Sequence, residues 1–225
     1  MTSPDTSIQQ NTRFQAVVFD LDGTLLNTLA DIAAAGNHVL KTFHLPPRPV
    51  GDYRHLAGQG VRWLVEQALG PELAHRVDQG VALLKAYQLE HGLDHTQPYE
   101  GIGELLDEFT RRTIPITILS NKPDPATHTA VHEKLNRWRF AIVQGARDGE
   151  PLKPDPAGAI AIAQTLEVQP SRVLYVGDTR ADMLTAKAAG MFAAGVLWGF
   201  REQRELRDAG ADVIVQRPRD LMDLL

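Results

Sequence analysis

Four short, continuously apolar segments constrain the fold of this chain more than any other feature of its sequence. They cover residues 16–19, 116–119, 173–176 and 193–197. Runs of this length, without alternation of polar and apolar residues, are typical of strands buried on both faces of a parallel sheet. Weaker runs at residues 140–143 and 213–215 predict two further strands.

Segments with apolar residues at three- and four-residue spacing separate these runs, at residues 103–112, 124–135, 156–166 and 181–189. Such alternation of strands and helices predicts an α/β fold, a doubly wound parallel sheet. In sheets of this kind, ligands bind beyond the carboxyl ends of the strands. Three of those ends carry Asp20, Ser120 and Asp178, so we expect the functional site there.

Residues 29–97 interrupt the alternation, because they contain helical patterns at 30–43, 61–69 and 72–91 but no convincing strand. We interpret them as an inserted α-helical cap, with residues 13–28 and 98–225 as the core. A series of helical crossovers within one domain is the alternative. Residues 1–12 are polar and are predicted to form a flexible N-terminal tail.

Composition argues against several classes of partner. The 225 residues carry 23 Lys and Arg against 28 Asp and Glu, a net charge of −5, whereas nucleic-acid binding needs clustered positive charge. No apolar run approaches the roughly 20 residues of a membrane-spanning helix. The first residues lack the layout of a secretory signal, and cysteine is absent. We therefore expect a cytoplasmic monomer or homodimer that binds neither nucleic acid nor membrane.

The first candidate site is the acidic pair Asp20 and Asp22, which follows the first strand and precedes Gly23. A carboxylate can attack a phosphoryl group and form an aspartyl phosphate. A second carboxyl group nearby can protonate the leaving alkoxide and then deprotonate the attacking water. Gly23 permits a sharp turn that aims both groups into one pocket. The alternative is an ordinary turn, for which Asp-Gly is a common dipeptide.

The second acidic pair is Asp178 and Asp182, which straddle the end of a strand and the first turn of the following helix. Mg²⁺ prefers oxygen ligands and takes only one or two carboxylates together with water and phosphate oxygens. This pair fits that preference. Helix capping is the alternative, and it explains one carboxylate better than it explains both.

Two further elements could meet a phosphate. Lys153 lies between Pro151 and Pro154, in a stretch whose prolines stiffen the backbone and could fix the lysine as a point charge. Ser120 and Asn121 offer a hydroxyl, an amide and backbone N–H groups at a strand end. Taken alone, the lysine could be solvated and the Ser-Asn pair could serve a turn.

Taken together, these motifs resemble those of the haloacid dehalogenase superfamily of phosphatases, from Phe14 almost to the end of the chain. The resemblance implies a Rossmann-like core and a helical cap that closes over the site. It also implies that Asp20 is the nucleophile, that Asp22 is the general acid and base, and that Ser120 and Lys153 orient the phosphoryl group.

The same resemblance implies a Mg²⁺ cofactor. Its ligands would be Asp20, the backbone carbonyl of Asp22, and Asp178, with Asp182 close by, directly or through water. Thr24 of the first motif and Asn121 of the second are predicted to bind substrate.

Within the superfamily, the chain is most similar to phosphoglycolate phosphatases, whose substrate is a small phosphate monoester. Residues 56–69, with Gly58-Gln59-Gly60 before a helix that carries Arg62, resemble part of their cap. The segment Ser120-Asn121-Lys122-Pro123 resembles their second motif. We therefore expect Gly58, Gln59, Gly60 and Arg62 to bind the carboxylate of 2-phosphoglycolate. Asn27-Thr28 departs from the usual acidic-Ser pair of the family.

Two other members of the superfamily fit the sequence less well, and two further alternatives stay open. A dehalogenase of the superfamily would lack Asp22, and a phosphomutase would generally carry His where this chain has Ile32. A phosphatase for pyrophosphate, a nucleotide or an amino-sugar phosphate stays open. So does a binding protein that keeps the fold without the chemistry, although the complete set of motif residues argues against it.

Overall fold

The computed structural model describes residues 13–225, and the predicted N-terminal tail lies outside the described residues. A six-stranded sheet with the order β5-β4-β1-β6-β7-β8 forms the centre of the core. Every neighbouring pair in it is parallel, so the predicted parallel α/β sheet is confirmed. Its strands are β1 (Ala16–Phe19), β4 (Ile116–Pro123), β5 (Ile142–Ala146), β6 (Val173–Gly177), β7 (Phe192–Val196) and β8 (Val213–Val215).

Apolar clusters cover both faces of this sheet. Val17 and Phe19 of β1 belong to one cluster, with α4 (Ile102–Arg111), α5 (Asp124–Lys134) and the 3₁₀ helix η4 (Pro218–Leu224). Ala16 and Val18 belong to the other, with α6 (Ala157–Thr165), α7 (Arg180–Ala188) and α8 (Gln203–Asp208). Successive side chains of a strand point to opposite faces, so a strand covered on both sides must be apolar throughout.

Strand β5 begins two residues later than the predicted run at 140–143. The main-chain N–H of Ala141 donates to the carbonyl of Ile116, and regular pairing with β4 starts at Ile142 opposite Thr117. Phe140 packs against the core from the loop before the strand. Its apolar character therefore reflects packing of a loop rather than membership of a strand.

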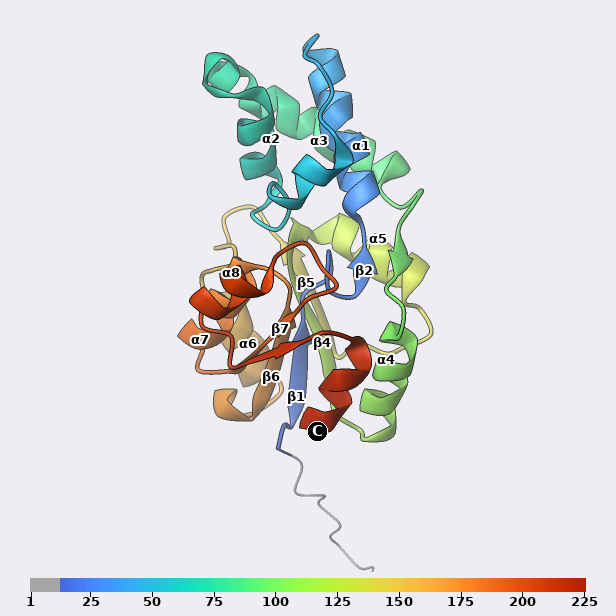
Figure 1. Ribbon diagram of the computed structural model, residues 1–225, viewed down its shortest axis with the longest axis vertical. Helices are drawn as coiled ribbons and strands as arrows, with labels where there is room; N and C mark the ends of the chain where they lie inside the picture. The colour runs from blue at the N-terminus through green and yellow to red at the C-terminus, as the bar shows by residue number, and fades with distance from the viewer. Residues whose placement is uncertain (1–12) are drawn as a thin grey trace, which may run out of the picture.

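The segment between core residues 28 and 98 is helical. It contains α1 (Leu29–Thr42), η1 (Val50–Arg54), α2 (Val61–Leu69), η2 (Pro71–Arg76) and α3 (Val77–His91). The predicted helix over 72–91 is two helices, because Leu73 departs from helical geometry and α3 begins at Val77. Figure 1 shows this segment, called the cap below, at the end of the molecule toward which β1 runs.

The chain enters and leaves the cap through a two-stranded antiparallel sheet, β2 (Leu26–Asn27) and β3 (Gln97–Pro98). The buried carboxylate of Asp31 on α1 accepts hydrogen bonds from the main chain of His95 and the hydroxyl of Thr96. These contacts tie the exit of the cap to its first helix. No helix among residues 13–225 is long and apolar enough to cross a membrane.

Candidate active site

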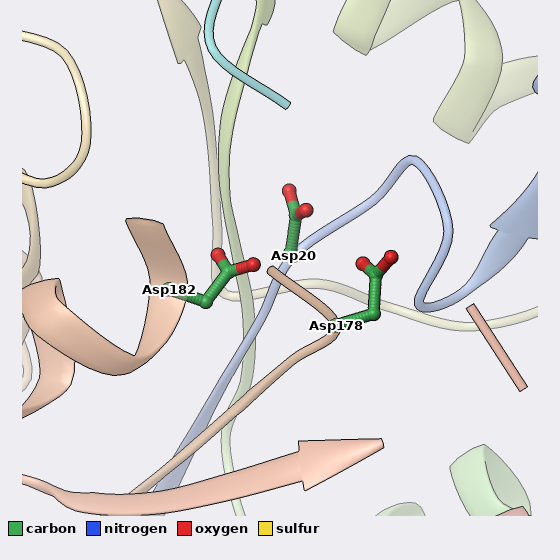
Figure 2. A group of neighbouring side chains, drawn as sticks. All are labelled: Asp20, Asp178 and Asp182. Atoms are coloured by element: carbon green, nitrogen blue, oxygen red, sulfur yellow. The ribbon is translucent and has the colours of Figure 1, made fainter. Parts of the chain in front are cut away.

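Three carboxylates from different parts of the chain meet at the carboxyl end of the sheet. Asp20 directly follows β1, and its N–H donates to the carbonyl of Val176 in β6 at 2.9 Å. Asp178 follows β6, and Asp182 lies in the first turn of α7. Oxygens of the three side chains lie within 4.8 Å of one another, and all three residues are buried. Figure 2 shows Asp20 between the other two in this view.

One ammonium group faces this acidic trio, which consists of Asp20, Asp178 and Asp182. Lys153 Nζ lies 2.8 Å from Asp20 Oδ1 and 2.7 Å from Asp182 Oδ1, and the lysine is itself buried. Although burial lowers the pKa of Lys153, the carboxylates of Asp182 and Asp20 raise it well above its usual value. The lysine therefore stays charged, but a single positive charge does not balance three ionised carboxylates.

The surplus of negative charge affects the protonation of the carboxyl groups. Burial raises the pKa of Asp20 well above its usual value, against the attraction of Lys153. Burial and the neighbouring charge of Asp182 raise the pKa of Asp178 to about 7. A further positive charge in the trio would lower both pKa values, because opposite charge favours the ionised form.

Asp178 is held in place by groups of the core. Its Oδ1 accepts a hydrogen bond from Thr24 Oγ1 at 2.9 Å, and its Oδ2 accepts one from the N–H of Phe200 at 2.7 Å. A Cβ at Gly23 would overlap with Asp178 Oδ2, and φ there is +88°, so glycine is required on both counts. Thr24 thus orients Asp178 in this structure, and its predicted contact with substrate stays a prediction.

Asp182 caps a helix, as the alternative interpretation of this residue predicts, and it also pairs with Lys153. It forms a capping box with Thr179 at the start of α7, in which its Oδ2 accepts from the N–H and the hydroxyl of Thr179. Its Oδ1 accepts from Lys153 Nζ. Both oxygens are therefore engaged by the protein, and direct binding of a metal by Asp182 stays a prediction.

Asp22, which is not part of the trio, is paired with Lys122, a residue of the second motif to which the sequence gave no role of its own. Lys122 Nζ lies 3.2 Å from each carboxylate oxygen of Asp22. The side chains of Lys122 and Asp22 are 5% and 13% exposed, so the pair is largely shielded from solvent. The sequence does contain a feature that could have identified Lys122: in a strand, residues two positions apart lie on the same face, so this residue is expected on the face of Ser120.

The end of β4 supplies the other predicted groups. Ser120 is buried and its Oγ accepts from the N–H of Lys122 at 3.2 Å. Asn121 Oδ1 accepts from the N–H of Lys153, while its Nδ2 donates to the carbonyls of Lys153 and Gly58. Asn121 therefore joins the Lys153 loop to the cap in this structure, and its predicted contact with substrate stays a prediction.

A cleft lies between core and cap. Its core side is lined by residues that follow β1, by the end of β4 and by the loop of Lys153: Asp20, Asp22, Ser120, Asn121, Lys122, Pro123 and Lys153. Its cap side is largely apolar, with Gln88 as the polar side chain among Ile32, Leu56, Ala57, Gly58, Gly60, Val61, Leu64 and Leu84.

The predicted cap residues divide between the cleft and the surface. Gly58 and Gly60 line the cleft, whereas Gln59 is exposed and Arg62 lies outside the lining. The guanidinium of Arg62 pairs with Asp78, and its side chain is 60% exposed. A role for Gln59 or Arg62 in binding substrate stays a prediction. Arg201, which the sequence analysis did not consider, donates to the cap carbonyls of His55 and Ala57.

The acidic trio fits a hard divalent cation. All of its donors are oxygens, which Mg²⁺ prefers. Asp20 Oδ1 accepts no hydrogen bond of good geometry despite its closeness to Lys153. A divalent cation would also offset the surplus of buried negative charge, whose cost is otherwise high. Asp20 is therefore the residue of the trio best suited to hold it, since both oxygens of Asp178 and of Asp182 already accept hydrogen bonds.

The chain is similar to known hydrolases and phosphatases over most of its length. The family model of haloacid dehalogenase-like hydrolases matches residues 17–196. Phosphoglycolate phosphatase 1 of Pseudomonas aeruginosa is 32% identical over 214 residues, 92% of this chain and 78% of the relative. The N-acetylmuramic acid 6-phosphate phosphatase of the same species is 32% identical over 216 residues, 95% of each chain.

A solved structure has the same fold. The hydrolase of the haloacid dehalogenase-like family from Streptococcus pneumoniae superimposes with a TM-score of 0.85 at 24% identity, covering 94% of this chain and 98% of that one.

Proposed function

The chain belongs to the haloacid dehalogenase-like hydrolase family, and we propose that it is a Mg²⁺-dependent phosphatase that hydrolyses a small phosphate monoester through an aspartyl phosphate on Asp20. One observation carries this proposal. A buried carboxylate paired with Lys153 and a second carboxylate, Asp22, line the same cleft, which also contains the hydroxyl of Ser120.

The two carboxylates divide the chemistry between them. The Asp20 carboxylate attacks phosphorus, a P–O bond to Asp20 forms, and the bond from phosphorus to the ester oxygen breaks. Asp22 gives its proton to that oxygen, so the alcohol leaves neutral. Asp22 then takes a proton from a water that attacks phosphorus, which releases phosphate and regenerates Asp20. Lys153 holds Asp20 and offsets the charge of the phosphoryl oxygens.

We assign Mg²⁺ binding to Asp20, Asp178 and the backbone carbonyl of Asp22, with Asp182 close by. When bound, the ion lowers the pKa of the carboxyl groups around it and neutralises charge on the phosphoryl oxygens. Thr24 and Phe200 keep the Asp178 carboxylate in one orientation through their hydrogen bonds.

2-Phosphoglycolate is the first candidate substrate. The names of relatives such as phosphoglycolate phosphatase 1 support it. An amino-sugar phosphate is the second candidate, supported by the name of the relative N-acetylmuramic acid 6-phosphate phosphatase. The cytoplasmic location and the monomeric or homodimeric state stay predictions.

Release of inorganic phosphate tests the proposal. Purified protein should hydrolyse 4-nitrophenyl phosphate and 2-phosphoglycolate with Mg²⁺ but not after removal of metal with EDTA. Asp20→Asn should abolish turnover while the melting temperature shows a folded protein. Asp107→Asn is the matched control, because Asp107 lies on α4 and pairs with Arg137 outside the cleft. Turnover by folded Asp20→Asn protein, or turnover without any metal, would contradict the mechanism.

A further inference from the structure

We propose that Lys122 binds the carboxylate of the substrate and thereby selects phosphate esters of α-hydroxy acids. This inference rests on the proposed function and names the recognition residue of the same cleft. From the sequence, Gly58, Gln59, Gly60 and Arg62 of the cap were predicted to bind this carboxylate. The structure instead places a buried cation beside the general acid, on the core side of the cleft.

Few positive charges line the cleft. Among the described residues that line it, the cations are Lys122 and Lys153. Lys153 is held by Asp20 and Asp182 at 2.8 and 2.7 Å. Within residues 13–225, no lysine or arginine of the cap lines the cleft. A substrate carboxylate that enters the cleft can therefore find an opposite charge only at Lys122.

The hydrogen-bonding capacity of Lys122 is only partly used. An ammonium group has three N–H donors. Its described side-chain contacts are the two oxygens of Asp22, each at 3.2 Å, which is longer than the usual 2.7–2.9 Å of such charged pairs. The side chain is 5% exposed, so solvent has little access to the remaining donor. A buried ammonium with a spare donor favours an additional acceptor.

The reaction itself brings a carboxylate to this position. Asp22 must contact the ester oxygen in order to protonate it. In 2-phosphoglycolate, one methylene group separates that oxygen from the carboxylate carbon. Because Lys122 contacts the carboxylate of Asp22, it lies beside the place where the substrate carboxylate must be. A hydroxyl group at the same position would bring a hydrogen bond but no charge.

The test compares two substrates on the same preparations. We would measure kcat/KM for 2-phosphoglycolate and for 2-hydroxyethyl phosphate, which has a hydroxymethyl group in place of the carboxylate. The wild-type protein should prefer 2-phosphoglycolate. Lys122→Met, which keeps the length of the side chain, should lower the ratio of the two values by roughly 30-fold, the scale expected for loss of a buried charged partner. Lys122→Arg should keep an intermediate ratio.

The substrate ratio separates recognition from a merely structural role. A loss of Asp22 alignment would slow both esters alike, because both leave as alkoxides that need a proton. The ratio is also independent of the fraction of protein that is folded. Lys85→Met is the matched control, since Lys85 lies on α3, is not among the residues that line the cleft, and pairs with Asp148. It should keep the wild-type ratio.

Three results would overturn the inference. One is an equal loss on both substrates in Lys122→Met, which would limit Lys122 to holding Asp22. Another is a wild-type ratio near one. The third is a ratio that falls in Gln88→Leu but not in Lys122→Met, which would move recognition to the cap. Failure of the proposed function is distinguishable, because the wild-type protein would then release phosphate from neither ester nor from 4-nitrophenyl phosphate.

Discussion

The crowding of carboxylates predicts that metal-free protein loses stability as the pH rises. Asp178 ionises near 3.8 in the unfolded chain and at about 7 in the folded protein. Between these values the folded state binds the extra proton, so the free energy of unfolding falls from about pH 4 to pH 7 and is then level. This rise in the pKa of Asp178 on folding corresponds to a decrease in the free energy of unfolding on the order of 4 kcal/mol by pH 8.

Asp178→Asn isolates this contribution. The amide oxygen can accept from the N–H of Phe200, and the amide nitrogen can donate to the hydroxyl of Thr24, so both hydrogen bonds of Asp178 have a counterpart. Without the charge, the variant should gain stability over the wild type from about pH 4 upward, by roughly a third of the full difference at pH 5 and by all of it at pH 8. For a protein of this size, about 4 kcal/mol corresponds to roughly 10 °C in melting temperature.

The assay is thermal unfolding in EDTA from pH 5 to pH 8, followed by circular dichroism. Asp107→Asn should follow the wild-type curve, since Asp107 lies outside the trio. Addition of Mg²⁺ at pH 8 should raise the melting temperature of the wild type well above that of Asp178→Asn. Parallel wild-type and Asp178→Asn curves across the whole pH range in EDTA would refute the reasoning, because the carboxylate would then carry no electrostatic cost.

Three further substitutions test the acid, the cap contacts and the cap loop. Asp22→Asn should slow hydrolysis of alkyl phosphates at least tenfold more than that of 4-nitrophenyl phosphate, because nitrophenolate leaves without a proton; equal losses would argue for a positional role. Arg201→Met removes the donor to the carbonyl of Ala57 and should lower stability by about 2 kcal/mol and raise KM, measured by denaturant unfolding and steady-state kinetics. Gly60→Val should lower the melting temperature, because φ is +89° there; an unchanged value would contradict the backbone argument.

The central part of the fold could be predicted because strands buried on both faces must be apolar throughout. The segments of β1, β6 and β8 were predicted to within one residue for this reason. The start of β5 was wrong, because Phe140 is apolar for packing from a loop. An apolar run indicates that its residues are buried, but residues of strands and of loops that cover them are both buried, so the run alone does not locate the end of a strand.

Asp20 and Asp178 could be located from the sequence because parallel strands bring their carboxyl ends to one edge. Lys153 lies seven residues beyond the end of β5, and its prediction came from the flanking prolines and from the family resemblance. The cap could not be read in the same way. Helical spacing identifies α2 but does not say which of its faces meets the cleft, and Arg62 instead pairs with Asp78, sixteen positions along the chain. The spacing of two between Ser120 and Lys122 predicts that both lie on the same face of the strand. It does not predict the contact of Lys122 with Asp22, which lies a hundred positions away in the sequence.

Phe200 shows how the cap and the acidic trio are physically joined. Its side chain belongs to the apolar cluster of the cap, with Tyr53 and Leu84, although the residue follows β7 in the core. Its main-chain N–H donates to Asp178 Oδ2 at 2.7 Å. Because interiors are close-packed, a shift of the cap cluster must be absorbed by the Phe200 ring or by its backbone. The orientation of the Asp178 carboxylate therefore depends on how the cap is seated, through a residue that belongs to both.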